Sequence, residues 1–159
     1  MGSIKTNAIR LLDGQKIEYS LYEYDTKDGL LDGASVANKT GKNPDSVFKT
    51  LVTVGNSKEH YVFCVPVLEE LDLKKAAKAA GEKKIEMILA RDITSVTGYI
   101  KGGCSPIGMK KKFKTFIHES CLQQERICVS GGKVGLQLEI KVGDLISVVN
   151  GKTEDIIKK

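Results

Sequence analysis

Residues 48–67 of the sequence read FKTLVTVGNSKEHYVFCVPV. Two segments rich in β-branched and aromatic residues, Phe48–Val54 and His60–Val67, flank the turn-forming sequence Gly55-Asn56-Ser57. This pattern predicts a β-hairpin, because such residues favour strands whereas glycine and asparagine favour the turn between them. The sequence therefore predicts a pair of antiparallel strands near the middle of the chain.

Further strands and helices are predicted on both sides of this hairpin. Alternating apolar residues predict strands, and amphipathic segments that stop at a glycine predict helices. The predicted strands are 17–22, 84–89, 113–118, 126–130 and 136–140, and the predicted helices are 5–12, 35–40, 72–80, 92–96 and 144–149. Consecutive strands interrupted by helices at irregular intervals predict an α+β domain with a mixed β-sheet, spanning residues 1–159.

Composition narrows the class of protein. A chain of 159 residues is long enough to bury a core as one domain. No apolar run approaches the roughly 18 residues of a membrane span, and the N-terminus lacks an apolar signal region, so we expect a cytoplasmic protein without a membrane partner. The four cysteines form no CxxC pair, so we expect reduced thiols and no metal site.

Residues 99–114, YIKGGCSPIGMKKKFK, combine a flexible backbone with concentrated positive charge. Their glycines allow the chain to bend closely around a ligand and to present N–H groups. They hold five lysines and no carboxylate, and the remaining 20 Lys and Arg residues equal the 20 Asp and Glu residues in number. The segment therefore predicts a negatively charged partner, the alternative being a turn followed by a solvated lysine face.

Known nucleophile and nucleotide motifs are incomplete in this sequence. The glycine loop resembles a P-loop, but Met109 stands where the lysine belongs, which argues against ATP hydrolysis. Ser105 lacks the glycine two places later that a nucleophile elbow requires. His60 and His118 have no partner motif, and we expect both to be structural. An enzyme of this sequence would work without a conventional triad or metal.

Three other positions indicate a site. Lys49 begins a strand among apolar neighbours, where it either protects a sheet edge or aims a fixed cation into a pocket. Ser130-Gly131-Gly132 ends another strand with a hydroxyl and two glycines, which suits close approach of a ligand. The third position is Tyr22, which lies in an alternating segment near the start of the chain, where its ring belongs either to the core or to a pocket.

Seven short motifs of the chain occur in an order that resembles the YbaK/EbsC family of bacterial aminoacyl-tRNA deacylases, which are related to the editing domain of prolyl-tRNA synthetase. The resemblance covers essentially the whole chain from Asn7 onward. The motifs are FKTL at 48–51, LDLKK at 71–75, KKIEM at 83–87, TGY at 97–99, GGCSPIG at 102–108, VSGGK at 129–133 and GDL at 143–145. The resemblance implies one α+β domain with a partly barrel-like sheet flanked by helices.

The resemblance also implies the activity and the residues that perform it. Family members hydrolyse cysteine from mischarged proline tRNA in trans, without a cofactor, and the partners it implies are aminoacylated tRNA and possibly prolyl-tRNA synthetase. The implied catalytic residues are Lys49, Gly102 and Gly103. The implied substrate-binding residues are Tyr22, Leu31, Ser105, Pro106, Ser130, Gly131, Gly132 and Asp144. The implied tRNA-binding residues are Lys101, Lys110, Lys111, Lys112 and Lys114.

The chemistry of the substrate is compatible with the missing protein nucleophile. An aminoacyl ester needs little activation, so positioning and oxyanion donors can suffice for catalysis. Family members are described as using the thiol of the substrate cysteine itself as the nucleophile. Two alternatives remain open at this point: a deacylase for another small amino acid such as alanine, and a non-catalytic module that binds the tRNA end or regulates.

Overall fold

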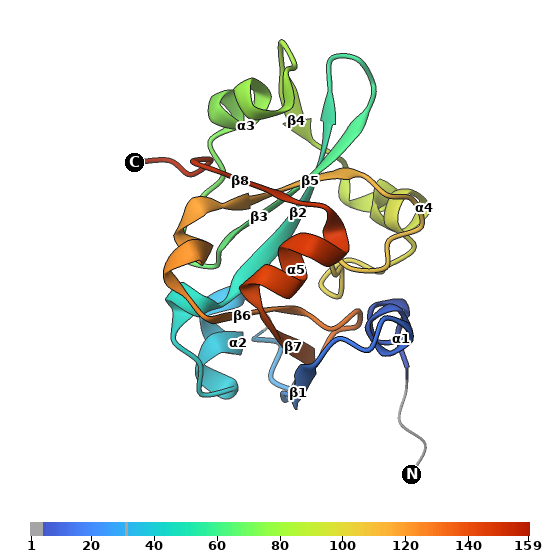
Figure 1. The fold of residues 1–159 in the computed structure, drawn as a ribbon, viewed down its shortest axis with the longest axis vertical. Helices are drawn as coiled ribbons and strands as arrows, with labels where there is room; N and C mark the ends of the chain where they lie inside the picture. Colours follow the sequence, from blue (N-terminus) through green and yellow to red (C-terminus); the bar gives the residue numbers. More distant parts are fainter. Residues whose placement is uncertain (1–4, 31) are drawn as a thin grey trace.

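The computed structural model of the chain describes residues 5–30 and 32–159. Within this part of the chain, eight strands form two sheets and five α-helices surround them (Figure 1). The larger sheet has the strand order β4-β2-β3-β5-β8, and the smaller has the order β1-β7-β6. The predicted α+β class is confirmed. The strands divide between two sheets, however, and do not close into a barrel.

Most elements lie within a few residues of their predicted positions. The helices are α1 (Asn7–Gly14), α2 (Gly33–Lys39), α3 (Leu73–Ala80), α4 (Ile93–Thr97) and α5 (Val142–Val149), with short 3-10 turns at Pro44–Ser46, Ala90–Asp92 and Glu119–Gln123. The strands are β1 (Tyr19–Glu23), β2 (Phe48–Gly55), β3 (His60–Pro66), β4 (Ile85–Met87), β5 (Lys114–His118), β6 (Arg126–Ser130), β7 (Leu136–Lys141) and β8 (Lys152–Glu154).

The predicted hairpin is the centre of the larger sheet. Strands β2 and β3 pair antiparallel from Phe48 opposite Pro66 to Val54 opposite His60. Strand β5 then adds to β3 in parallel, and β8 adds to β5 in parallel. Strand β8 was not predicted, because its three residues include no apolar residue and its position depends on pairing with a distant strand. The larger sheet is mixed, as predicted.

The smaller sheet packs against the larger one and meets it at one end. An isolated parallel bridge joins Val47, just before β2, to Cys128 in β6. Helix α2 covers this junction, where Ala37, Val47 and Cys128 form a small buried cluster with Val67 packed against it. The main core lies between the two sheets and helices α1 and α5, with Leu12, Phe48 and other apolar side chains fully buried. The start of β2, the end of β6 and α2 are therefore held together by buried contacts.

None of the described helices is long and apolar enough to cross a membrane.

Candidate active site

A small cavity of about 200 Å³ lies at the junction of the two sheets. Its walls come from α2, the start of β2, the end of β6, the start of β7 and the glycine loop after α4. The described residues that line it are Tyr24, Gly33, Val36, Val47, Phe48, Lys49, Thr50, Val67, Gly102, Cys104, Val129, Ser130, Leu136 and Gln137. The structure thus brings together three positions singled out in the sequence, Lys49, Gly102 and Ser130, from three distant segments.

Lys49 is the one charged side chain among the described residues that line this cavity. It lies at the second position of β2, opposite Val65 of β3, and is half-buried. No ion pair within the described residues involves its ammonium group. The nearby Lys42, by contrast, pairs with Glu139 at 3.0 Å. Lys49 therefore presents an uncompensated positive charge in apolar surroundings, where an anionic group gains most from it.

The glycine loop supplies backbone N–H groups, but not the pair that the sequence indicated. Gly103 donates its N–H to the carbonyl of Ile100 at 3.0 Å, which closes a turn. Gly102 has a φ of 85° and lines the cavity, and no hydrogen bond within the described residues uses its N–H or that of Cys104. The available donors are therefore the N–H groups of Gly102 and Cys104, whereas Gly103 has a structural role.

The structural role of Gly103 follows from its close contact with the backbone of the segment after β6. A Cβ atom added to Gly103 would lie 2.7 Å from the Cα of Lys133 and 2.8 Å from the backbone nitrogen of Val134. Real Cβ atoms do not approach backbone so closely, so any side chain at this position would push the two segments apart. Gly103 lets the glycine loop lie directly on the segment that follows β6.

Internal hydrogen bonds hold the remainder of this loop in one shape. The buried hydroxyl of Tyr99 donates to the carbonyl of Ile107 at 2.6 Å, and burial raises the pKa of this phenol, which stays protonated. Ser105 is fully buried, and its Oγ accepts the N–H of Ile107 at 3.3 Å. Ser105 is therefore not among the lining residues: it shapes the loop from behind, as a satisfied buried hydroxyl does.

The Ser130-Gly131-Gly132 turn is likewise divided between the cavity and the scaffold. Ser130 lines the cavity, and its Oγ accepts the N–H of Gly132 at 3.2 Å. Thr6, which caps α1, donates its hydroxyl to the carbonyl of Gly131 at 2.6 Å. Neither glycine lines the cavity. Both position Ser130 and attach α1 to the back of the site.

Gln137 lines the cavity and was not singled out from the sequence. It stands opposite Ser130 in the β6–β7 hairpin, is 3% exposed, and donates its Nε2 to the hydroxyl of Thr40 at 3.0 Å. The signal that could have found it is register. The Gly131-Gly132 turn makes the flanking residues face each other, so Gln137, the first polar residue of an alternating strand, turns toward the same side as Ser130.

Several implied site residues lie away from the cavity walls. Tyr22 stands opposite Gln137 in β1, but its hydroxyl donates to Glu139 at 3.3 Å and accepts from Lys42 at 3.1 Å. Lys42 also donates to Glu139 at 3.0 Å, and its hydrogen bonds to Tyr22, first, and to Glu139, second, raise the pKa of its ammonium group. Asp144 lies in the first turn of α5, outside the lining. Pro106 lines a different pocket, and Leu31 is outside the described residues.

No strong protein nucleophile faces the cavity within the described residues. Burial raises the pKa of the Cys104 thiol to about 11, so it is protonated at neutral pH. The two histidines are elsewhere: His118 Nδ1 accepts the N–H of Ile156 at 3.3 Å, and His60 packs edge-on against Phe113. Among the described residues, no group of three or more His, Cys, Asp or Glu side chains is placed to hold a metal ion.

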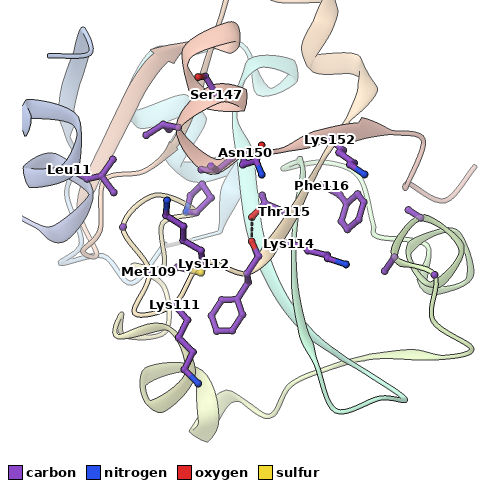
Figure 2. Close-up of a pocket in the computed structure, with 18 of the residues that line it drawn as sticks. Leu11, Met109, Lys111, Lys112, Lys114, Thr115, Phe116, Ser147, Asn150 and Lys152 are labelled. Atoms are coloured by element: carbon purple, nitrogen blue, oxygen red, sulfur yellow. Dashed lines mark hydrogen bonds between the residues drawn. The ribbon is translucent and has the colours of Figure 1, made fainter. Parts of the chain in front are cut away.

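The five lysines of the glycine loop divide between different surroundings. Lys101 is exposed and precedes Gly102 in the chain without lining either pocket, and Lys110 donates to the carbonyl of Ser95 at 3.2 Å. Lys111, Lys112 and Lys114 line a second, larger pocket of about 870 Å³ (Figure 2). The two pockets have no lining residue in common. Different parts of the glycine loop line each of them: Gly102 and Cys104 line the small cavity, and residues from Pro106 onward line the larger pocket.

The small cavity brings one cation together with backbone N–H groups that have no partner among the described residues, an arrangement of the kind that can stabilise a developing oxyanion. The chain belongs to the family of the aminoacyl-tRNA editing domain, whose pattern matches residues 31–148. It is 46% identical over 155 residues to the EbsC protein of Enterococcus faecalis, named as a candidate Cys-tRNA(Pro)/Cys-tRNA(Cys) deacylase, covering 98% of this chain and 94% of that one.

Solved structures share the fold over nearly the whole chain. A crystal structure described as a candidate trans-editing enzyme for prolyl-tRNA synthetase has a TM-score of 0.84 and 20% identity, with 99% of this chain and 100% of that chain covered. The hypothetical protein APE2540 has a TM-score of 0.86 and 18% identity, with 96% and 99% covered. These likenesses confirm the predicted fold family.

Proposed function

We propose that this chain is a trans-editing deacylase that hydrolyses the ester of mischarged aminoacyl-tRNA, with Cys-tRNA(Pro) as its substrate. The observation that supports it is the small cavity, in which Lys49 and the free N–H groups of Gly102 and Cys104 meet in an editing-family fold. Its volume of about 200 Å³ is below the range of about 300–1,000 Å³ typical of pockets for drug-sized ligands. A small aminoacyl group suits this space.

The groups around the cavity divide the work of binding and catalysis. The N–H groups of Gly102 and Cys104 donate to the carbonyl oxygen of the ester as it gains negative charge, and the loop is already held in shape before the reaction. Lys49 holds the terminal phosphate or ribose and adds fixed positive charge. Ser130 and Gln137 offer polar contacts to the amino acid. Tyr22, with Lys42 and Glu139, supports the Gln137 side of the pocket.

The attacking group in this proposal comes from the substrate. The cysteine sulfur attacks its own carbonyl carbon, the bond from that carbon to the ribose oxygen breaks, and the thiol proton passes to the leaving oxygen. The products are a tRNA with a free ribose hydroxyl and a cyclic thiolactone, which water opens to cysteine. A thiol is a few per cent ionised near neutral pH and is intrinsically a strong nucleophile, so no protein base is needed.

The tRNA itself meets the positively charged surface. Lys101, Lys110, Lys111, Lys112 and Lys114 contact phosphates, which gives affinity that depends on salt and not on sequence. Selection of proline tRNA comes from association with prolyl-tRNA synthetase, and the place of action is the cytoplasm.

The functional unit is the whole chain. Helix α1 and strand β8 lie outside the matched residues 31–148, yet Ala8 and Leu12 of α1 and Ile156, just after β8, are fully buried. Truncation to residues 31–148 would therefore expose core.

The test is a deacylation assay with purified protein and tRNA(Pro) charged with cysteine, alanine or proline. We expect rapid release of cysteine, slower release of alanine, and little release of proline. A pocket of this kind separates side chains that differ by one methylene by only about 1–3 kcal/mol, so some release of alanine is compatible with the proposal. Failure to release cysteine from tRNA at any enzyme concentration would show that the chain is a binding module.

A further inference from the structure

The larger pocket, of about 870 Å³, is distinct from the small cavity and has a strongly positive rim. It lies between α1, the C-terminal ends of α3 and α5, the start of β5, and the segment 106–113 (Figure 2). Its charged lining residues are all lysines: Lys78, Lys111, Lys112, Lys114 and Lys152. Each is exposed, and none forms an ion pair within the described residues, whereas seven other lysines do.

The inner surface of this pocket combines apolar and polar groups in similar amounts and includes the ring of Phe113. Met109 and Phe113 contribute from the loop and Leu11 from α1, whereas Phe116 of β5 is only 4% exposed and stacks on Phe63. Phe113 is half-buried, and its ring packs edge-on against His60 at a centroid distance of 5.7 Å, so it is fixed in orientation. Ser147 and Asn150, at the C-terminal end of α5, add hydrogen-bonding groups to the lining of the same pocket. Such a surface accepts a planar, partly apolar group.

The charges favour an anion despite two helix ends in the wall. Helices α3 and α5 both direct their C-terminal ends to this pocket, and each such end carries about half a negative charge. Five lysines outweigh this charge several times. Because the helix ends offer carbonyls and not N–H groups, every positive group at this pocket is an ammonium on a flexible stem.

We propose that this pocket binds a single-stranded RNA segment of the substrate tRNA, at a site separate from the one that takes the aminoacyl ester. Mobile ammonium groups follow a sugar-phosphate backbone while a base packs on the partly exposed ring of Phe113 and on Met109 and Leu11 beside it. A small nucleotide would need convergent, fixed phosphate donors, which this wall lacks among its described residues. The proposal rests on the proposed function only in identifying the RNA as tRNA.

Lys111, Lys112 and Lys114, assigned above to tRNA phosphates, then belong to a defined RNA-binding pocket. Lys78 of α3 and Lys152 of β8 belong to the same pocket. The RNA bases, and not only the phosphates, are then part of the recognised ligand. We also predict that RNA binds when no amino acid and no terminal adenosine are present.

The experiment is a fluorescence-anisotropy titration of the full chain with a labelled single-stranded RNA of about ten nucleotides that lacks a 3′-CCA end. The variant is Lys112→Gln with Lys152→Gln. The matched control is Lys74→Gln with Lys83→Gln, since these lysines are exposed, have no ion pair within the described residues, and lie outside the pocket. Both doubles change the net charge equally.

We expect the Lys112→Gln, Lys152→Gln variant to bind on the order of tenfold more weakly. The plot of log affinity against log salt concentration should become less steep by about 1.4, since each lost contact to a single strand removes about 0.7 from the magnitude of the slope. The control should bind as the wild type does, and a duplex of the same length should bind more weakly than the single strand. Equal loss in both doubles, no binding of the probe, or equal affinity for the duplex would overturn the proposal.

Because the probe carries no ester, the result is independent of catalysis. Loss of binding in the pocket double together with no deacylation in the charged-tRNA assay would overturn the proposed function alone. Deacylation by a protein whose RNA binding ignores the pocket lysines would overturn this inference alone.

Discussion

The two pockets on either side of the glycine loop are built in opposite ways. The small cavity has one cation, Lys49, and backbone groups fixed by hydrogen bonds, in mainly apolar walls. The larger pocket has five exposed lysines around a floor of mixed polar and apolar groups. Fixed donors in a dry site can stabilise a developing charge, whereas mobile surface cations mainly increase affinity. On this proposal the glycine loop separates the site of chemistry from the site of RNA binding. Changes at Gly103, Lys49, Gln137 and Cys104 test the first of these two sites.

The largest effect is expected at Gly103, because it fixes the glycine loop against the backbone of Lys133. Gly103→Ala places a Cβ 2.7 Å from the Lys133 Cα and displaces the N–H groups of Gly102 and Cys104. A misplacement of about 1 Å can cost on the order of a hundredfold in rate, and we expect a loss of kcat/KM of that size for Cys-tRNA(Pro).

The matched control for this change is Gly143→Ala in α5, where no atom lies within 4 Å of the added Cβ. It should leave kcat/KM unchanged. A Gly103→Ala protein with full activity and an unchanged melting temperature would show that the loop position is not fixed by this contact.

Removal of the single cation of the small cavity comes next. Lys49→Ala should lower kcat/KM by at least tenfold, about 1.4 kcal/mol of transition-state stabilisation, because no other described charge lines the cavity. The melting temperature should change little, since Lys49 makes no ion pair among the described residues. Lys74→Ala, which removes an exposed lysine elsewhere, serves as the control. Wild-type turnover by folded Lys49→Ala protein would be incompatible with this role.

Gln137 should contribute a smaller share. Gln137→Leu keeps the approximate volume of the side chain but removes its amide, so about 1 kcal/mol of hydrogen bonding to substrate is lost, or about fivefold in kcat/KM. Thr40, its present partner, still donates its hydroxyl to the carbonyl of Val36 at 2.8 Å. The exposed Gln123→Leu is the control. Identical kinetics of the two variants would exclude Gln137 from substrate binding.

The smallest effect is expected at Cys104, whose side chain has no chemical part in the proposal. Cys104→Ala keeps the backbone N–H and should retain most of the deacylase activity. Because burial raises the pKa of this thiol to about 11, its thiolate is populated only as the pH approaches that value. Alkylation of Cys104 by iodoacetamide should therefore be slow at pH 7 and accelerate up to about pH 11. An inactive Cys104→Ala protein would indicate that this thiol is the nucleophile.

The comparison of sequence and structure shows which parts of the site local patterns can reveal. Apolar periodicity and glycine stops placed the β2–β3 hairpin and strand β6 correctly, because such signals act over a few residues. Lys49 was found for a similar reason, as a charge in an apolar strand. Strand β8 was missed because its pairing with β5 is non-local.

Functional roles within the glycine loop depended on hydrogen bonding that the sequence does not display. Nothing in the residue types distinguishes Gly102 from Gly103, yet only the second donates its N–H to Ile100. Five lysines between residues 101 and 114 looked like one cluster, but only Lys111, Lys112 and Lys114 line the larger pocket, and Lys101 and Lys110 line neither pocket. Gln137 emerges only from the register of the β6–β7 hairpin.

The central claim, that the small cavity positions an ester for attack by the substrate's own thiol, is tested most directly by comparing Cys-tRNA(Pro) with Ser-tRNA(Pro) in single turnover. The two substrates differ by one atom and fill the cavity almost equally. We predict that the serine ester is hydrolysed far more slowly, because its hydroxyl is much less nucleophilic near pH 7 than a partly ionised thiol. Equal rates on the two esters would contradict the claim and would require water or a protein group as the attacking species.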